Sequence, residues 1–423
     1  MDVDILDGTV PTESSPVDKL PFELLASIFI MLSHETRSHL DRNSAPWTVT
    51  KVCSKWRDIC LNSPRAWSIL NLTDDVRNIR NASALLQVFL DRSQSSNLHI
   101  SVHFYSRGCE HIFQELWKSR SRWESATICA SYCMVQVWRV QGVAAEMRTL
   151  RSLELDIADI GVLKILVNAP LLQHLILSPF LETSFPLGTL QSLHCRPPNA
   201  AAFFKVLQEA KCLTECSFDF NEDLKGSFTS SEVTHSSIRR LSTTHALSAF
   251  NTVTLSNLED LSVVYGRGGK HGLAPLVGLV SRSHTPLKQL ELKFSFKLEE
   301  FLPLLKASPS LTSLILHRVP LSEVHLILTA LTLRDDGSAV VPHLTHLTID
   351  FHGDRTEFLG RRLLRMIHSR IEKLEAFRLM LRNILVVEVL GTRMLASLTK
   401  ETLQSEWKEL CCNILRREGR LRS

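Results

Sequence analysis

The sequence predicts a mixed α/β fold in three parts. Two amphipathic helical patterns lie within residues 20–72, and a leucine motif recurs from residue 150 to residue 379. A third helical pattern covers residues 392–417. Apolar residues three or four apart are typical of a helix, and alternating ones are typical of a strand. We therefore expect a helical N-terminal module, a repetitive α/β array and a C-terminal helical cap.

Composition excludes several functional classes. The chain has 423 residues, of which 44% are hydrophobic and 22% charged, enough for a large core and more than one unit. The net charge of +4 is small, and basic residues occur in pairs such as Arg239-Arg240, not in a stripe with aromatic residues. We expect no nucleic-acid partner.

The sequence also favours an intracellular protein. Residues 1–18 are acidic, without a secretory signal, and are expected to be a disordered tail. The most apolar stretches, 160–172 and 379–390, contain charged residues before a membrane-spanning length of about 20 residues is reached. Ten cysteines lie mostly in apolar segments, which indicates reduced thiols. We expect no membrane partner and a cytoplasmic or nuclear location.

The two N-terminal helical patterns expose more apolar surface than so few residues can bury among themselves. Pro21 suits the first turn of a helix, and Pro64 ends the second pattern. The apolar positions are Leu20, Leu24, Leu25, Ile28, Phe29 and Leu32 in the first pattern, and Val49, Val52, Cys53, Trp56, Ile59 and Cys60 in the second. The surplus predicts a protein partner.

The order of residues in this segment resembles a known family. The run LPFELLASIFIML, followed by VCSKWRDI and SPRAW, closely resembles the F-box, in particular the F-box-like domains abundant in fungal proteins. The resemblance covers residues 20–72, with a longer polar insert at 33–46. It implies that the helices bind a Skp-type adaptor, which docks on a cullin and so on a ubiquitin-conjugating machine. Carried over by position, the adaptor-binding residues are Leu20, Pro21, Leu24, Leu25, Ile28, Phe29, Val52, Cys53 and Trp56.

An internal repeat of the form L-x-x-L-x-L follows. Ten copies begin at residues 150, 172, 190, 213, 238, 258, 287, 311, 344 and 374. Their mean spacing is about 25 residues, within the span of roughly 20–29 residues known for leucine-rich repeats. Each copy predicts one strand. Helical patterns are expected between strands at 161–168, 201–210, 273–281, 299–306, 323–331 and 356–367. Parallel strands with crossover helices stack into an irregular, curved leucine-rich-repeat solenoid, or horseshoe.

These patterns give a division of the chain. We expect the tail at 1–18, the F-box at 19–72, transitional units at 73–149, the solenoid at 150–380 and the helical cap at 381–423. In the transitional part we expect a helix at 85–93, a strand at 98–102 and a degenerate repeat at 123–128. The cap would hide the last open face of the solenoid.

The alternating positions of the repeat strands predict a binding surface. Leucines face the core, so the side chains between them line the concave face. The candidate target-binding residues are Glu154, Asp156, His174, His194, Asp219, Arg240, Asp260, Glu291, Lys293, His317, His346 and Asp350. Their charges are mixed, so the sequence does not identify the target.

Catalytic and metal motifs have little support. His34 and His39 are five residues apart, whereas two zinc ligands on one helix face must be four apart. The glycine-rich segment 266–272 lacks phosphate-loop spacing and is expected to be a loop. Cys109 precedes His111, but we expect a surface turn there rather than a thiol nucleophile. We expect no enzymatic activity, no cofactor and no metal.

Binding is then the main expected activity. The resemblance implies the substrate receptor of a cullin-based, SCF-type ubiquitin ligase. Two alternatives stay open: a leucine-rich-repeat scaffold or inhibitor whose helical hairpin only caps the domain behind it, and an enzyme with a novel site.

Overall fold

The computed structural model describes residues 16–36, 38–130, 145–157, 167–178, 187–197, 199–220, 232–245, 247–265, 272–333, 339–352, 365–367, 369–370, 376–381 and 384–390. They form two compact units, and the first ends at residue 172. Both units contain helices and parallel strands, so the predicted mixed α/β class is confirmed. No helix among the described residues is long and apolar enough to cross a membrane.

The first unit begins with a small helical module. Its elements are η1 (Pro16–Lys19), α1 (Phe22–His34), η2 (Val49–Lys51), α2 (Ser54–Leu61) and η3 (Pro64–Trp67). The rings of Trp47 and Trp67 meet edge to face with centroids 5.1 Å apart. The guanidinium of Arg92 lies 4.4 Å from the Trp67 centroid, so an aromatic core closes the module.

The second helical pattern does not form one continuous helix, contrary to the sequence prediction. η2 ends at Lys51, and Cys53 takes an extended backbone conformation with φ of −155°. Cys53 becomes the N-cap of α2, since its sulfur accepts a hydrogen bond from the Trp56 N–H at 3.5 Å. The apolar spacing of three and four continues across this break, so periodicity could not locate it.

A parallel sheet follows the helical module in the first unit. Its strands are, in order, β1 (Ile69–Thr73), β2 (Leu98–Phe104), β3 (Trp123–Ala130) and β5 (Ser152–Ile157). The connections contain η4 (Asp74–Asn78), α3 (Ala82–Arg92), α4 (Glu110–Lys118) and η5 (Arg120–Arg122). The predicted helix at 85–93 and the strands at 98–102 and 123–128 are confirmed.

Two local predictions in the first unit were wrong. Cys109 is fully buried at the start of α4, where a surface turn was expected, because the next turn of α4 packs Ile112 and Phe113 into the core. Val167–Asn168, expected to end a helix, form strand β6, which pairs in parallel with β4 (Ala145–Glu146). Residues 161–166 lie outside the described residues.

The second unit contains most of the repeats. Its strands run in chain order as β7 (His174–Ser178), β8 (Ser192–Cys195), β9 (Glu215–Asp219), β11 (Arg240–Thr244), β13 (Asp260–Val264), β14 (Gln289–Lys293), β15 (Ser313–Pro320), β16 (His346–His352) and β17 (Ala376–Leu381). Each pairs in parallel with its neighbours, and β18 (Ile384–Leu390) then pairs antiparallel with β17. Strand β18 was not predicted.

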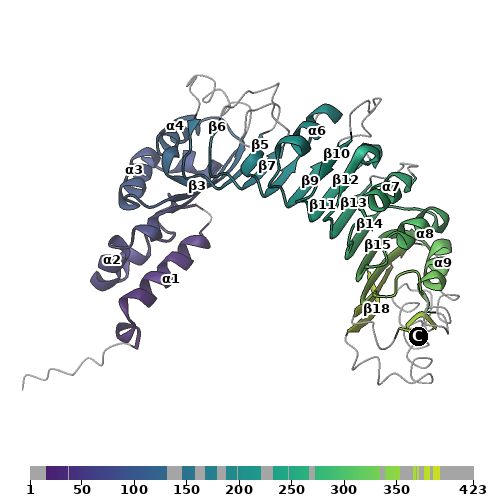
Figure 1. Cartoon of the computed structure of the whole chain (residues 1–423). Coiled ribbons are helices and arrows are strands. Elements are labelled where there is room, and N and C mark those ends of the chain that lie inside the picture. Colours follow the sequence, from purple (N-terminus) through teal and green to yellow (C-terminus); the bar gives the residue numbers. More distant parts are fainter. Residues whose placement is uncertain are drawn as a thin grey trace, which may run out of the picture. The chain divides into compact units, whose positions relative to one another are not determined.

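Helices cover one face of the second unit's sheet (Figure 1). They are α6 (Ala200–Glu209), α7 (Ala274–Ser283), α8 (Leu298–Lys306) and α9 (Leu321–Leu331), close to four of the six predicted ranges. Short segments η6 (Leu187–Thr189), η7 (Leu247–Thr252), β10 (Val233–His235) and β12 (Val253–Leu255) also lie between strands, and β10 pairs with β12. In the range predicted at 356–367, only 365–367 is described, and it is helical. The predicted helix at 392–417 lies outside the described residues.

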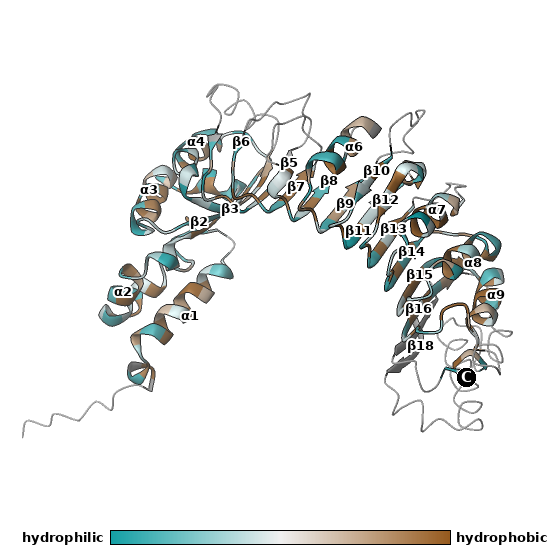
Figure 2. Cartoon of the chain, viewed as in Figure 1, coloured by the Kyte–Doolittle hydropathy of each residue, from teal (hydrophilic) through white to brown (hydrophobic). Residues whose placement is uncertain are grey.

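The leucine motif produces the core of the array. In the nine copies whose side chains are described, every L-x-x-L-x-L position is at most 3% exposed. The two inner positions alternate with half-buried or exposed residues along each strand, as in β7 and β11 (Figure 2). The sheet therefore has one buried face and one open, mainly polar face.

A row of backbone hydrogen bonds extends the parallel pairing by one residue before the strands. The N–H of each member donates to the carbonyl oxygen of the member before it, at 2.7–2.9 Å. The row runs through Gln173, Gln191, Thr214, Arg239, Glu259, Lys288, Thr312 and Thr345. It fixes the register between successive repeats, and hence the position of each open-face side chain.

Candidate interaction surfaces

α1 has two apolar faces, of which one is buried and the other is exposed. Leu25, Phe29 and Ser33, four residues apart, are buried toward α2 and η3. The ring of Phe29 lies 5.1 Å from that of Trp56, which is half-buried. Leu24 and Ile28 lie on the neighbouring line of the helix and are exposed. The inner face therefore holds the module together and leaves the outer face free.

Large apolar side chains are exposed on α1 and just after η2. Six of them, which we call the α1 face, are between 42% and 67% exposed. They are Phe22, Leu24, Ile28, Met31 and Leu32 from α1, and Val52, which follows η2. Hydrophobic residues run along much of α1 in Figure 2. Clusters of exposed apolar side chains mark protein interaction sites in soluble proteins.

The predicted adaptor-binding residues divide among three environments. Pro21, Leu24, Ile28, Val52 and Cys53 are exposed. Leu20 and Trp56 are half-buried, and Leu25 and Phe29 are buried, so these last two can only support the surface from behind. Phe22 and Met31 were not predicted as contacts. Met31 is three residues after Ile28, and this spacing could have identified it.

Hydrogen bonds attach the helical module to the sheet of the first unit. The hydroxyl of Ser33 lies 3.0 Å from the carbonyl oxygens of both Phe29 and Ala66. The His39 ring contacts the Ser33 carbonyl oxygen and the Asn71 N–H, each at 2.9 Å. Both ring nitrogens are thus occupied in the core, so His39 is not a free metal ligand and the His34–His39 pair forms no site.

The open face of the second unit's sheet carries ordered rows of polar side chains. Because the strands pair in register, Glu215, Arg240 and Asp260 are neighbours in one row. Ser217, Ser242 and Ser262 form the next row, and the carboxyl end carries Asp219 and Thr244. Small hydroxyls therefore lie between two rows that contain the charges.

Most charges on this face are paired with each other. Arg240, one of the basic pair Arg239-Arg240, contacts Glu215 at 2.8 Å. Arg239 and Lys288 both contact Glu259, at 2.6 and 2.7 Å. The cations of these pairs are exposed to solvent, where an ion pair adds little to the stability of the fold. Their main effect is to fix an alternating charge pattern on the surface.

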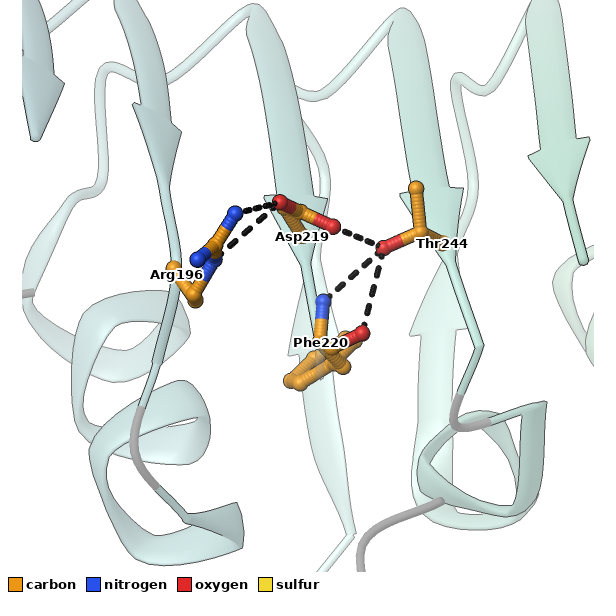
Figure 3. A network of polar contacts seen from close by, with 4 residues as sticks. All are labelled: Arg196, Asp219, Phe220 and Thr244. Atoms are coloured by element: carbon orange, nitrogen blue, oxygen red, sulfur yellow. Dashed lines mark hydrogen bonds and ion pairs between the residues drawn. The ribbon is translucent and has the colours of Figure 1, made fainter. Parts of the chain in front are cut away.

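Asp219 is the centre of one polar network (Figure 3). Arg196, which follows β8, donates two hydrogen bonds to Asp219 Oδ2, at 2.6 and 3.1 Å. Thr244 on β11 donates to the other oxygen, and its hydroxyl also accepts the Phe220 N–H at 2.9 Å. Although burial opposes the shift, the hydrogen bonds from Thr244 and Arg196 lower the pKa of Asp219. Asp219 is therefore held as an anion.

A second network brings together four predicted residues. Glu291 contacts Lys293 at 2.9 Å and His317 at 3.5 Å, and His317 contacts Asp350 at 3.6 Å. Ser262 adds a hydrogen bond to Glu291 at 2.7 Å. The contact with His317, followed by those of Lys293 and Ser262, lowers the pKa of Glu291 to about 2 despite partial burial.

The other target-binding candidates are more dispersed. Asp350 is only 5% exposed, less than expected for a residue lining an open face. Glu154 and Asp156 lie on β5 in the first unit, where Glu154 accepts a hydrogen bond from Thr127 at 3.2 Å. His174, His194 and His346 are exposed on β7, β8 and β16. The structure brings only part of the predicted set into contact.

The described residues offer little for catalysis. No group of three or more His, Cys, Asp or Glu side chains among them could hold a metal ion. Burial, with the nearby Asp74 carboxylate, raises the pKa of the Cys109 thiol to about 11, opposite to the shift that activates a thiol. The seven cysteines within the described ranges are free thiols.

No protein-family model matches the chain, and no curated protein matches its sequence.

Proposed function

We propose that the chain is the substrate receptor of a cullin-based, SCF-type ubiquitin ligase. The helical module is an F-box whose α1 face binds a Skp-type adaptor. The repeats form a leucine-rich-repeat solenoid whose open face binds the target protein. The observation that carries the proposal is the α1 face itself, six large apolar side chains exposed on a module of two short helices.

The energetics of this face support a partner. Burying one such side chain fully stabilises a protein by about 1.5–3 kcal/mol. Burial of the six exposed side chains against a partner would therefore contribute several kcal/mol to binding. The first unit does not use them, since Leu25 and Phe29 already close its core. Leu24, Ile28 and Val52, which the F-box resemblance assigns to the adaptor, are also among the exposed six.

The open sheet face suits recognition of a folded or extended protein target. Its charges alternate, and its carboxylates at Asp219 and Glu291 are held ionised by their neighbours. Such a surface selects its partner by charge complementarity more than by apolar area. The receptor itself would contribute proximity, by raising the local concentration of target lysines near an external conjugating enzyme, and no bond chemistry.

The proposed setting is the cytoplasm or the nucleus, where the adaptor and cullin would be found. Free thiols at buried positions such as Cys60 and Cys195 are compatible with a reducing compartment.

Reconstitution tests this function. The full chain is mixed with a purified Skp-type adaptor and a cullin, and the mixture is separated by size-exclusion chromatography. We expect all three proteins to elute together. Without the adaptor, we expect the chain and the cullin to elute separately. A folded chain that elutes alone in the complete mixture would contradict the proposal.

A further inference from the structure

A shallow surface cavity of about 470 Å³, largely open to solvent, lies in the first unit. Two segments line it: the loop after α1, and the connection from η4 into α3. The lining residues are Leu40, Asp41, Arg42, Ile79, Arg80, Asn81 and Leu85. None of them belongs to the α1 face or to the open sheet face.

The charge of this cavity is mainly positive. Arg42 and Arg80 are exposed, and neither guanidinium makes a hydrogen bond or ion pair in the part of the chain that the structure describes. The one carboxylate of the lining, Asp41, accepts the N–H of Asn43 at 2.9 Å. The lining therefore carries two arginines against one carboxylate, and neither arginine is ion-paired among the described residues.

The cavity also has an apolar side. Leu40 is buried, and Ile79 and Leu85 are half-buried. Binding sites for small ligands combine an apolar wall with a few well-placed polar groups. A guanidinium presents its N–H donors in a planar fork that matches the oxygens of a carboxylate or a phosphate.

We propose that this cavity binds an anionic group, a carboxylate or a phosphate monoester, carried on an apolar body. Arg42 and Arg80 hold the anionic oxygens, and the apolar body lies against Ile79 and Leu85. The site goes beyond the proposed receptor function and does not depend on it, since none of its residues contributes to the α1 face.

Calorimetric titration of the full chain with small probes tests the site. Phenyl phosphate and phenylacetate each combine an anion with an apolar body, whereas inorganic phosphate has only the anion and phenol only the body. We expect the two combined probes to bind about tenfold or more tightly than the two partial ones. The tighter of the combined probes identifies the preferred anion.

Variants locate the binding. Arg42→Gln with Arg80→Gln is expected to weaken binding of the better probe about tenfold or more, because each substitution removes a charge-assisted contact. The control, Arg57→Gln with Arg107→Gln, changes two exposed arginines of the same unit that lie outside the cavity and is expected to leave affinity unchanged. Circular dichroism confirms that both variants fold. Equal affinities for the two variants, or no binding of either combined probe to the folded chain at millimolar concentration, would overturn the proposal.

Discussion

His39 and Asn71 join the helical module to the first strand. The Nδ1 atom of His39 accepts the backbone N–H of Asn71 at 2.9 Å, so Nδ1 carries no proton. Nε2 then carries the ring proton and donates it to the carbonyl oxygen of Ser33 at 2.9 Å. The N–H of His39 also donates to the Asn71 carbonyl oxygen at 3.1 Å. A neutral imidazole therefore ties the end of α1 to β1.

This link makes the stability of the first unit depend on pH. Burial lowers the pKa of His39 from 6.5 to about 4. Between these two values the unfolded chain binds the proton and the folded chain does not. The stabilisation that comes from keeping His39 neutral is fully present above about pH 6.5. It is lost as the pH falls to about 4, which lowers the free energy of unfolding by about 3 kcal/mol.

Urea unfolding followed by tryptophan fluorescence measures this effect. The five tryptophans among the described residues all lie in the first unit: Trp47, Trp56, Trp67, Trp117 and Trp123. The variant His39→Gln should show a flatter dependence between pH 6.5 and pH 4. A wild-type unfolding free energy that stays constant over this range would show that His39 is not held neutral.

Substitutions at two neighbouring positions of α1 should affect stability and adaptor binding separately. Phe29→Ala removes a fully buried ring and is expected to lower the free energy of unfolding by about 3–5 kcal/mol. Ile28→Ala removes an exposed side chain and should cost about 0.5 kcal/mol or less, yet weaken adaptor binding. Denaturant unfolding and calorimetry measure the two effects. Equal losses of stability for the two variants would contradict the assignment of the two faces.

Cysteine alkylation should report on the adaptor surface. Cys53 and Cys212 are exposed, whereas Cys60, Cys109, Cys129, Cys195 and Cys216 are buried. Of these seven cysteines of the described residues, brief iodoacetamide treatment of the native chain, followed by mass spectrometry, should modify Cys53 and Cys212 first. Saturating adaptor should protect Cys53, next to Val52, and leave Cys212 reactive. Protection of both or of neither would argue against contact at η2 and α2.

Glu291 should stabilise the second unit in its ionised form. Glu291→Gln is expected to lower stability by about 1.5–3 kcal/mol at pH 7, because it weakens charge-assisted contacts with Lys293 and His317. The folded pKa is about 2 and the ordinary value is 4.5, so this contribution is present above about pH 4.5 and disappears as the pH falls to about 2.

Thermal unfolding followed by circular dichroism at pH 7 and pH 3 gives the comparison for Glu291. The gap between wild type and Glu291→Gln should narrow at pH 3. Glu299→Gln, an exposed change in the first turn of α8, serves as the control and should cost no more than about 1 kcal/mol, the usual size of a charge effect at a helix N-terminus. A gap of the same size at both pH values would mean that the charge of Glu291 is not what stabilises the unit.

Sequence patterns predicted the repetitive part well because burial there follows a fixed period. The motif at Leu287, Leu290 and Leu292 places one leucine before strand β14 and two inside it, all fully buried. Periodicity did not predict which residues of α1 are buried, because apolar residues occupy two neighbouring faces of this helix. Leu24 and Leu25 are equally apolar, and only the position of α2 and η3 decides which one is buried.

Other features depended on geometry that periodicity does not contain. The extended backbone at Cys53 interrupts a helical pattern without changing its spacing. The cavity at Arg42 and Arg80 combines segments almost 40 residues apart, and no pattern in the sequence links them. The burial of Asp350 arises from its place on β16 beside His317.

The most direct test of the proposed receptor is the affinity of the full chain for a purified Skp-type adaptor. Calorimetry would compare wild type, Leu24→Asp with Ile28→Asp, and the control Leu171→Asp with Leu326→Asp, which changes two leucines of similar exposure outside the α1 face. Circular dichroism would show that each is folded. We expect tight binding by wild type and control, and loss of binding by the α1 variant. A folded wild type that does not bind, or a folded α1 variant that binds as tightly as the control, would contradict it.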